Sequence, residues 1–215
     1  MKHGFVFLVD VDNTLLDHDR LKERVGEFLD GLPGGIGAGP FWQLYEEVRT
    51  GTGIADLPET ARRYGIASGT REVESELDRM LWEFPFDELV YPGVHDALQR
   101  LGTLGLPVIV CDGNDGYQRQ KLRATGIDLL VEGRIHVFEH KEAHVRELVN
   151  LYRSDHYVMV DDKPRIHAAM RRELGRRVTT VLVKQGHYAS APAAPGTVDL
   201  EIASLADLST LTSFT

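Results

Sequence analysis

Short apolar runs alternate with longer stretches of helical spacing along most of this chain. Four nearly continuous apolar runs have the pattern of buried parallel strands, and they lie at residues 5–9, 107–111, 157–160 and 178–183. Shorter strand candidates lie at residues 129–131, 135–138 and 200–202. Segments with apolar residues three and four positions apart separate these runs and are predicted to be helices. Strands that alternate with helices predict an α/β fold with a parallel, Rossmann-like sheet.

A helical pattern without any strand signal fills residues 15–91. The first helix of this stretch is expected to end at Pro33-Gly34-Gly35, and Pro40 is placed to begin the second. A third helix is expected at residues 57–64 with Gly65 as its stop, and Thr70 is placed to cap a fourth. We therefore expect a helical domain of residues 15–91, inserted into a core formed by residues 1–14 and 92–215.

Composition and charge narrow the classes of partner. The 215-residue chain has a formal net charge of -9 and no long basic run, which argues against nucleic acid or an anionic membrane as the main partner. The single cysteine, Cys111, cannot form an internal disulfide, which is typical of a reducing compartment. The first apolar run is too short to span a membrane, and no signal-peptide pattern surrounds it. The sequence thus predicts a cytoplasmic protein.

Carboxylates follow three of the expected strands. Asp10 and Asp12 come after the first strand, Asp112 follows Cys111 at the end of the second, and Asp161-Asp162 ends a third. Because the carboxyl ends of parallel strands meet at one edge of a sheet, these side chains are expected to share one crevice. Such a cluster of hard oxygen ligands suits Mg²⁺. A solvated strand end or a helix cap are the alternative interpretations of these carboxylates.

The same residues carry a resemblance to a known family. The chain resembles members of the haloacid dehalogenase-like hydrolase superfamily, because four motifs occur in the expected order. These motifs are Asp10-Val11-Asp12-Asn13-Thr14, Val108-Ile109-Val110-Cys111-Asp112-Gly113, Lys141, and Val158-Met159-Val160-Asp161-Asp162. The helical insertion directly after the first motif is similar to the cap domain of one large class in that superfamily.

The resemblance implies a role for each motif residue. Asp10 would be the nucleophile and form an aspartyl-phosphate, while Asp12 would protonate the leaving oxygen and then activate water. Lys141 would stabilise the nucleophile and the charge of the phosphoryl group. The resemblance further implies a Mg²⁺ site formed by the Asp10 carboxylate, the Asp12 carbonyl and either Asp161 or Asp162. It also implies a phosphate-binding turn formed by Cys111, Asp112 and Gly113.

Two residues bear on the reaction class. Dehalogenases of this superfamily do not use an acid where this chain has Asp12, so that carboxylate favours phosphate-ester hydrolysis. Cys111 stands where the family normally has Ser or Thr, and a thiol is a weaker donor to phosphate. A buried structural thiol is therefore an equal interpretation of Cys111. Either member of the Asp161-Asp162 pair is able to bind the metal, and we favour Asp162.

These observations predict a Mg²⁺-dependent phosphatase that acts on a small phosphorylated metabolite beneath a helical cap. A phosphoryl-transferring mutase is the first alternative. A catalytically weakened binding or regulatory protein is the second, because Cys111 departs from the family pattern. A 2-haloacid dehalogenase is the third. The sequence does not determine the substrate or the oligomeric state.

Overall fold

A parallel sheet forms the centre of the molecule. The computed structural model describes residues 3–210. The strands of this part of the chain are β1 (His3–Val9), β2 (Leu106–Asp112), β3 (Ile135–Phe138), β4 (Ser154–Asp161), β5 (Val178–Val183) and β6 (Leu200–Ile202). They form one sheet in the order β3-β2-β1-β4-β5-β6, and every neighbouring pair is parallel. The predicted α/β fold class is confirmed.

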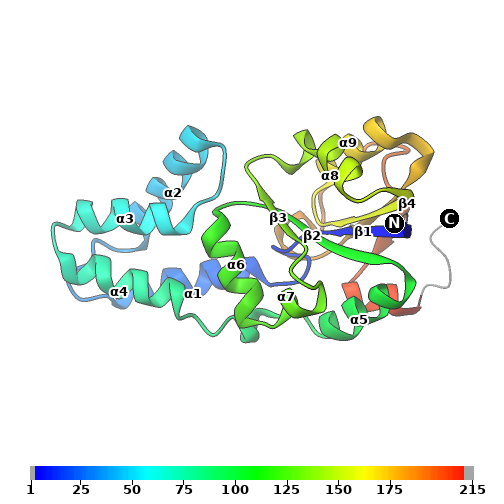
Figure 1. Cartoon of the computed structure of the whole chain (residues 1–215). Helices are drawn as coiled ribbons and strands as arrows, with labels where there is room; N and C mark the ends of the chain where they lie inside the picture. The colour runs from blue at the N-terminus through cyan, green and yellow to red at the C-terminus, as the bar shows by residue number, and fades with distance from the viewer. Residues whose placement is uncertain (1–2, 211–215) are drawn as a thin grey trace.

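Helices cover both faces of this sheet (Figure 1). One face packs against α5 (Val94–Leu104), α6 (Asp115–Ala124) and α7 (Ile127–Leu130). The other face packs against α8 (Val145–Leu151) and α9 (Pro164–Leu174). The alternation of side chains along each strand explains the two cores, because Phe7 and Val9 join the first cluster while Val6 and Leu8 join the second. Short 3₁₀ helices complete this region at η2 (Lys141–Ala143), η3 (Gly175–Arg177), η4 (Gly186–Tyr188) and η5 (Leu205–Thr210).

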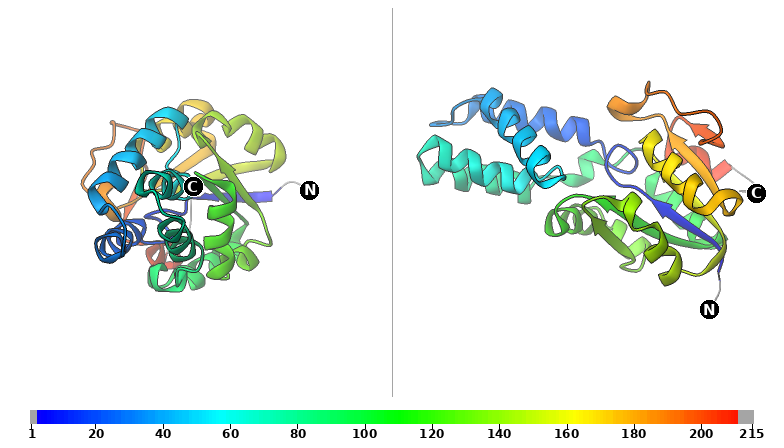
Figure 2. Two further views of the ribbon diagram at one scale, coloured as in Figure 1. Left: turned by 90° about the vertical axis from the view of Figure 1, so that its left-hand side faces the viewer. Right: turned by 90° about the horizontal axis from the view of Figure 1, so that it is seen from above.

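Four helices lie beyond the carboxyl ends of the strands, where they form a separate group (Figures 1 and 2). They are α1 (His18–Gly31), α2 (Ala38–Thr52), α3 (Leu57–Ser68) and α4 (Arg71–Trp82), followed by the 3₁₀ helix η1 (Phe86–Leu89). Their apolar faces pack on one another through residues such as Leu21, Phe41 and Leu77. The group therefore faces the edge of the sheet at which the predicted site residues lie.

Most of the expected elements are present close to their predicted limits. Strands β5 and β6 occupy the predicted residues 178–183 and 200–202. The apolar residues Leu205, Leu208 and Leu211 also predict a terminal helix over residues 205–211. Leu205–Thr210 form a 3₁₀ helix, and Leu211 lies outside the described residues. No helix within residues 3–210 has the length and apolar character needed to cross a bilayer.

Two details of the sequence prediction were wrong. Residues 129–131 were expected to be a strand, but α7 occupies Ile127–Leu130. A short apolar run does not by itself distinguish a strand from a buried helical turn, and Gly126, at φ 67°, starts the helix here. Gly65 does not end α3, which continues to Ser68 and stops at Gly69. Gly65 lies inside the helix because α4 packs closely there, and a Cβ atom on Gly65 would be 2.5 Å from Cβ of Glu74.

Candidate active site

The strand order brings the predicted site residues to one place. Strand β1 lies between β2 and β4, so the carboxyl ends of these three strands are adjacent. Asp10 directly follows β1, Asp112 ends β2, and Asp161 ends β4 with Asp162 next to it. In an open parallel sheet, this edge is the usual place for a ligand.

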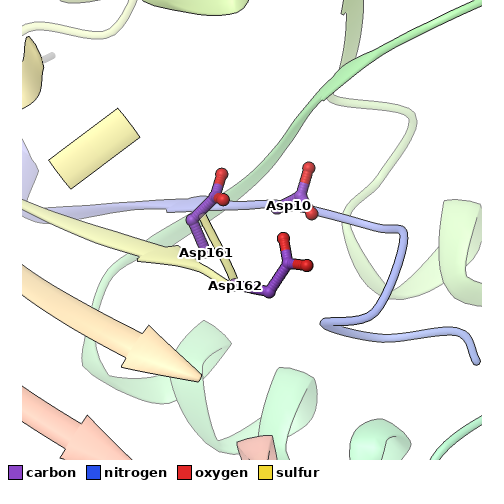
Figure 3. Close-up of side chains that lie close together, drawn as sticks. All are labelled: Asp10, Asp161 and Asp162. Carbon is purple, nitrogen blue, oxygen red and sulfur yellow. The ribbon is translucent and has the colours of Figure 1, made fainter. Parts of the chain in front are cut away.

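Three buried carboxylates meet at the centre of this edge (Figure 3). Asp10, Asp161 and Asp162 each place a carboxylate oxygen within 4.8 Å of the others. The ammonium of Lys141, which is 2% exposed, contacts Oδ1 of Asp10 and lies 2.6 Å from Oδ2 of Asp161. Thr14 donates a hydrogen bond from Oγ1 to Oδ2 of Asp10 over 3.3 Å. Lys141 and Thr14 thus hold the two oxygens of Asp10 in fixed positions.

Burial and charge compete at this cluster. Burial raises the pKa of Asp10, and the ammonium of Lys141 opposes that rise only in part. Burial alone would lower the pKa of Lys141, but Asp10 and Asp161 raise it above its ordinary value. Lys141 is therefore a cation at neutral pH. The backbone N–H of Lys141 donates to Oδ1 of Asp112 at 2.7 Å, which fixes the start of the loop that carries the lysine.

Asp162 differs from its two neighbours because its charge is poorly compensated. Both of its carboxylate oxygens are buried without a hydrogen-bond partner among residues 3–210. Lys163 Nζ lies 3.7 Å from one of them. Burial is the main cause that raises the pKa of Asp162 to about 8, and the repulsion from Asp10 and Asp161 contributes to this rise while Lys163 opposes it. Unpartnered buried oxygens are costly, and a hard divalent cation beside Asp10 would satisfy them.

Asp161 has more partners than Asp162. Its Oδ1 accepts a hydrogen bond of 2.8 Å from the backbone N–H of Lys163, and its Oδ2 contacts Lys141. His167, which is fully buried, contacts the Asp161 carbonyl through Nε2 at 3.0 Å. These contacts leave Asp162 with the freer oxygens. The donor set of Asp10, Asp161 and Asp162 therefore fits a magnesium ion, with Asp162 the better placed of the pair to accept it.

Asp12 has a different environment from Asp10. Its carboxylate accepts hydrogen bonds from Lys121 Nζ and, at 2.8 Å, from Gln118 Nε2 of the same helix, α6. His18 Nδ1 lies 3.6 Å from Oδ1 of Asp12. Burial would raise the pKa of Asp12, but Lys121 and His18 outweigh it and hold that pKa well below its usual value. Asp12 is therefore a carboxylate in this arrangement.

Cys111, Asp112 and Gly113 of the predicted phosphate-binding turn each already contact another group of the protein. The Cys111 thiol lies in the apolar cluster on the α5 and α6 side of the sheet, with Sγ 3.9 Å from the His136 carbonyl oxygen. Burial raises the pKa of this thiol, so it stays protonated. The backbone N–H of Gly113 donates to the Phe138 carbonyl at 2.9 Å. A phosphate contact by Cys111, Asp112 or Gly113 stays a prediction.

A cleft of about 540 Å³ lies between the four-helix group and the sheet edge. Core residues such as Asp12, Asp162 and Lys163 line one side, and Lys22, Tyr45 and Arg49 of α1 and α2 line the other. Asn114 connects the two sides, because its Nδ2 donates to Oδ2 of Asp56 at 3.0 Å while its Oδ1 accepts from the Tyr117 N–H. Asn114 is also the N-cap of α6, and Asp56 is the N-cap of α3. The cleft is thus bounded by both parts of the molecule.

Several residues of the cleft were not recognised as functional from the sequence. Lys121 is 1% exposed, and a lysine on the buried face of a helix was the available signal. His18 and Lys22 are four residues apart, which places them on one side of α1. Their position relative to Asp12 depends on how α1 is placed in the folded chain, which the sequence pattern does not show.

Comparison with known proteins gives two kinds of match. The family model described as haloacid dehalogenase-like hydrolase matches residues 6–175. A haloacid dehalogenase-like hydrolase from Burkholderia xenovorans shares 36% identity over 98% of this chain and 100% of its own, with a TM-score of 0.89. A search of curated proteins finds no match.

More distant solved structures show the fold alone. The HAD hydrolase YfnB from Bacillus subtilis, solved with bound magnesium, is 17% identical over 97% of each chain, with a TM-score of 0.62. An L-2-haloacid dehalogenase from Xanthobacter autotrophicus is 17% identical over 98% of each chain, with a TM-score of 0.57. The solved structures that share this fold therefore include a haloacid dehalogenase.

Proposed function

Because this chain belongs to the haloacid dehalogenase-like hydrolase family, we propose that it is a Mg²⁺-dependent phosphatase acting on a small phosphomonoester. The supporting observation is the pair of buried, unpartnered oxygens on Asp162, which lie beside Asp10 and Asp161 in the part of the chain that the structure describes. Such a cluster suits a divalent cation, and phosphoryl transfer is a chemistry in which a divalent cation neutralises the developing charge.

Asp10, Asp161 and Asp162 are the residues that would hold the ion. When bound, Mg²⁺ would neutralise charge on the phosphoryl oxygens during transfer. Lys141 adds a fixed positive charge in contact with Asp10 and Asp161, which lowers the repulsion between these carboxylates and an incoming phosphate dianion. The cluster is thus prepared to receive an anion despite its three acidic groups.

Asp10 is the proposed nucleophile. One of its carboxylate oxygens attacks phosphorus, the bond from phosphorus to the leaving oxygen breaks, and an aspartyl-phosphate forms. Lys141 and Thr14 orient the carboxylate for this attack, since each contacts a different oxygen. In the second step water attacks the same phosphorus, and the bond between phosphorus and Asp10 breaks to release phosphate.

Asp12 is the proposed carrier of the proton. The charge of an incoming phosphate dianion counters that of Lys121 and raises the pKa of Asp12, which takes up a proton from the solvent. This acid form of Asp12 then donates its proton to the leaving oxygen. Once that product has left, Lys121 and Gln118 stabilise the Asp12 carboxylate. The carboxylate then accepts a proton from the attacking water and returns it to the solvent when phosphate leaves, which restores the starting carboxylate.

Dehalogenation of a 2-haloacid is the second candidate, because an L-2-haloacid dehalogenase shares the fold. The charges of the site favour it less. A departing halide gains stability from donors and cations, whereas Asp161 and Asp162 place two further acidic groups beside Asp10. The carboxylate of Asp12 adds a fourth, and the resemblance described above associates an acid at that position with phosphate-ester chemistry.

The test is hydrolysis of a panel of phosphorylated metabolites and p-nitrophenyl phosphate, with Mg²⁺ or with EDTA. We expect turnover only with Mg²⁺, and Asp10→Asn to lower kcat by roughly three orders of magnitude or more, because an amide is a poor nucleophile. Asp78→Asn is the matched control, since Asp78 is an exposed aspartate on α4.

Two results would contradict the proposal. One is unchanged turnover in Asp10→Asn, which would exclude the aspartyl-phosphate. The other is release of halide from 2-chloropropionate by a protein that hydrolyses none of the phosphate esters, which would favour the dehalogenase.

A further inference from the structure

The cations that line the cleft are not equally compensated. Four of them contact an acidic side chain, and these pairs are Lys121 with Asp12, Lys163 with Asp162, Arg49 with Glu46, and Arg165 with Glu142. Lys22 also lines the cleft, yet it forms no ion pair with any residue between 3 and 210. In a chain with a net charge of -9, acids are plentiful, so an uncompensated lysine in a cleft calls for an explanation.

Aromatic rings hold the Lys22 ammonium in place. Its Nζ lies 5.3 Å from the centre of the Trp42 ring and 5.1 Å from that of Tyr45, both on α2. Such cation–π contacts orient an ammonium but leave its full charge, unlike a carboxylate partner. Tyr45 itself lines the cleft, and burial raises the pKa of its hydroxyl to about 12, so this hydroxyl is a neutral donor at neutral pH. Lys22 and Tyr45 together have the composition of an anion-binding site.

The position of Lys22 relates it to the leaving group. His18 lies 3.6 Å from Asp12, the residue proposed to protonate the leaving oxygen. Helix α1 runs away from the sheet (Figure 2), and Lys22 lies one turn further along it than His18, a rise of about 6 Å. A short leaving group attached to a phosphate at Asp10 would therefore extend past Asp12 toward Lys22.

We propose that Lys22, supported by Trp42 and Tyr45, binds a second anionic group on the substrate, a carboxylate or a second phosphate at the end of the leaving group. The inference rests on the proposed phosphatase function and narrows its substrate class. The preferred substrates are short phosphomonoesters of hydroxy acids, or short bisphosphates, rather than phosphorylated alcohols without another charge.

Matched substrate pairs test the proposal. The first pair is 3-phosphoglycerate against glycerol 3-phosphate, and the second is propane-1,3-diol bisphosphate against the corresponding monophosphate. We expect the wild-type KM to be roughly ten-fold lower for the more anionic member of one pair, as for one charge-assisted hydrogen bond. The pair that shows the difference identifies the second group as a carboxylate or a phosphate.

Variants of α1 separate charge from folding. Lys22→Gln should abolish most of the KM difference within the preferred pair, while Lys22→Arg should retain it because the charge remains. Arg24→Gln is the control, because it removes the same charge from the exposed side of the same helix and should retain the difference. Thermal unfolding of each variant verifies that α1 remains folded.

The outcomes distinguish this inference from the function on which it rests. Turnover of both members of each pair with equal KM, or a KM difference that persists in Lys22→Gln, would leave the phosphatase intact and overturn the role of Lys22. Absence of turnover of every phosphate ester with Mg²⁺ would instead overturn the phosphatase proposal and the substrate class with it.

Discussion

Asp12 and Asp10 are two residues apart, yet their surroundings shift the pKa values of the two carboxyl groups in opposite directions. Asp10 lies among acids with Lys141 as its cation, whereas Asp12 is turned toward Lys121 and Gln118 of α6. The pKa of Asp10 is consequently raised and that of Asp12 is lowered. Separate environments of this kind allow one carboxylate to attack and the other to move protons.

The pairing of Lys121 with Asp12 leads to a prediction about stability. Lys121→Met should destabilise the protein by about 3 kcal/mol, because it leaves the largely buried Asp12 carboxylate without its cation. Adding Asp12→Asn removes that uncompensated charge, so Asp12→Asn/Lys121→Met should be more stable than Lys121→Met alone. Urea unfolding of the single and double variants measures both effects. A double variant less stable than Lys121→Met would show that the pair is not the source of the loss.

At the residue scale, the sequence motifs identified Asp10, Lys141 and the Asp161-Asp162 pair, and the structure places these residues together. The difference between Asp161 and Asp162 was not predictable, because it depends on which oxygens Lys141 and Lys163 reach. The proposed role of Lys22 was not predictable either, because it depends on contacts with the rings of Trp42 and Tyr45 on another helix.

Helix packing explains the one glycine whose role was misjudged. Gly65 was expected to end α3, as glycine commonly does, but it lies inside the helix, where the absence of a side chain allows α4 to pack closely. Cβ of Glu74 on α4 lies only 2.5 Å from where a Cβ on Gly65 would be. The sequence pattern within α3 has no information about its packing against α4, so the close contact at Gly65 was not predictable from it.

The close approach of α3 and α4 gives a prediction for matched glycines. Gly65→Ala should destabilise the protein by about 1–3 kcal/mol, because the added methyl group collides with Glu74. Gly102→Ala, in α5 with no atom within 4 Å of the new Cβ, should stabilise it by roughly 0.5–1 kcal/mol through helix propensity. Thermal and urea unfolding measure both changes. A stabilising Gly65→Ala would mean that α3 and α4 separate at little cost.

The acidic cluster couples the stability of the whole molecule to pH. The pKa of Asp162 is about 8 in the folded protein against an ordinary value of 3.8. Between these values the folded protein retains a proton that the unfolded chain has lost, so rising pH lowers the stability of the metal-free protein. Metal binding requires the deprotonated carboxylate, so Mg²⁺ should bind better as the pH rises toward 8.

This linkage predicts a pH-dependent effect of magnesium on thermal stability. The rise in Tm on adding Mg²⁺ should be larger at pH 8 than at pH 6, and at one hundred times Kd it should reach about 5–10 °C for a chain of this length. Differential scanning fluorimetry with Mg²⁺ or EDTA at both pH values measures it. Asp162→Asn should lose most of the gain. An equal gain at both pH values, or in Asp162→Asn, would contradict a magnesium site at this cluster.

The amino-acid pattern predicts the α/β fold and the set of carboxylates that meet at one edge of the sheet. It does so because apolar periodicity is local, and because parallel strands bring their carboxyl ends together whatever their order. The folded chain alone reveals that Asp12 faces Lys121, that Asp162 has two buried oxygens without a hydrogen-bond partner among residues 3–210, and that Lys22 lines the cleft. These contacts join α1, α2, α6 and β4, and their geometry depends on packing between segments that are distant along the chain.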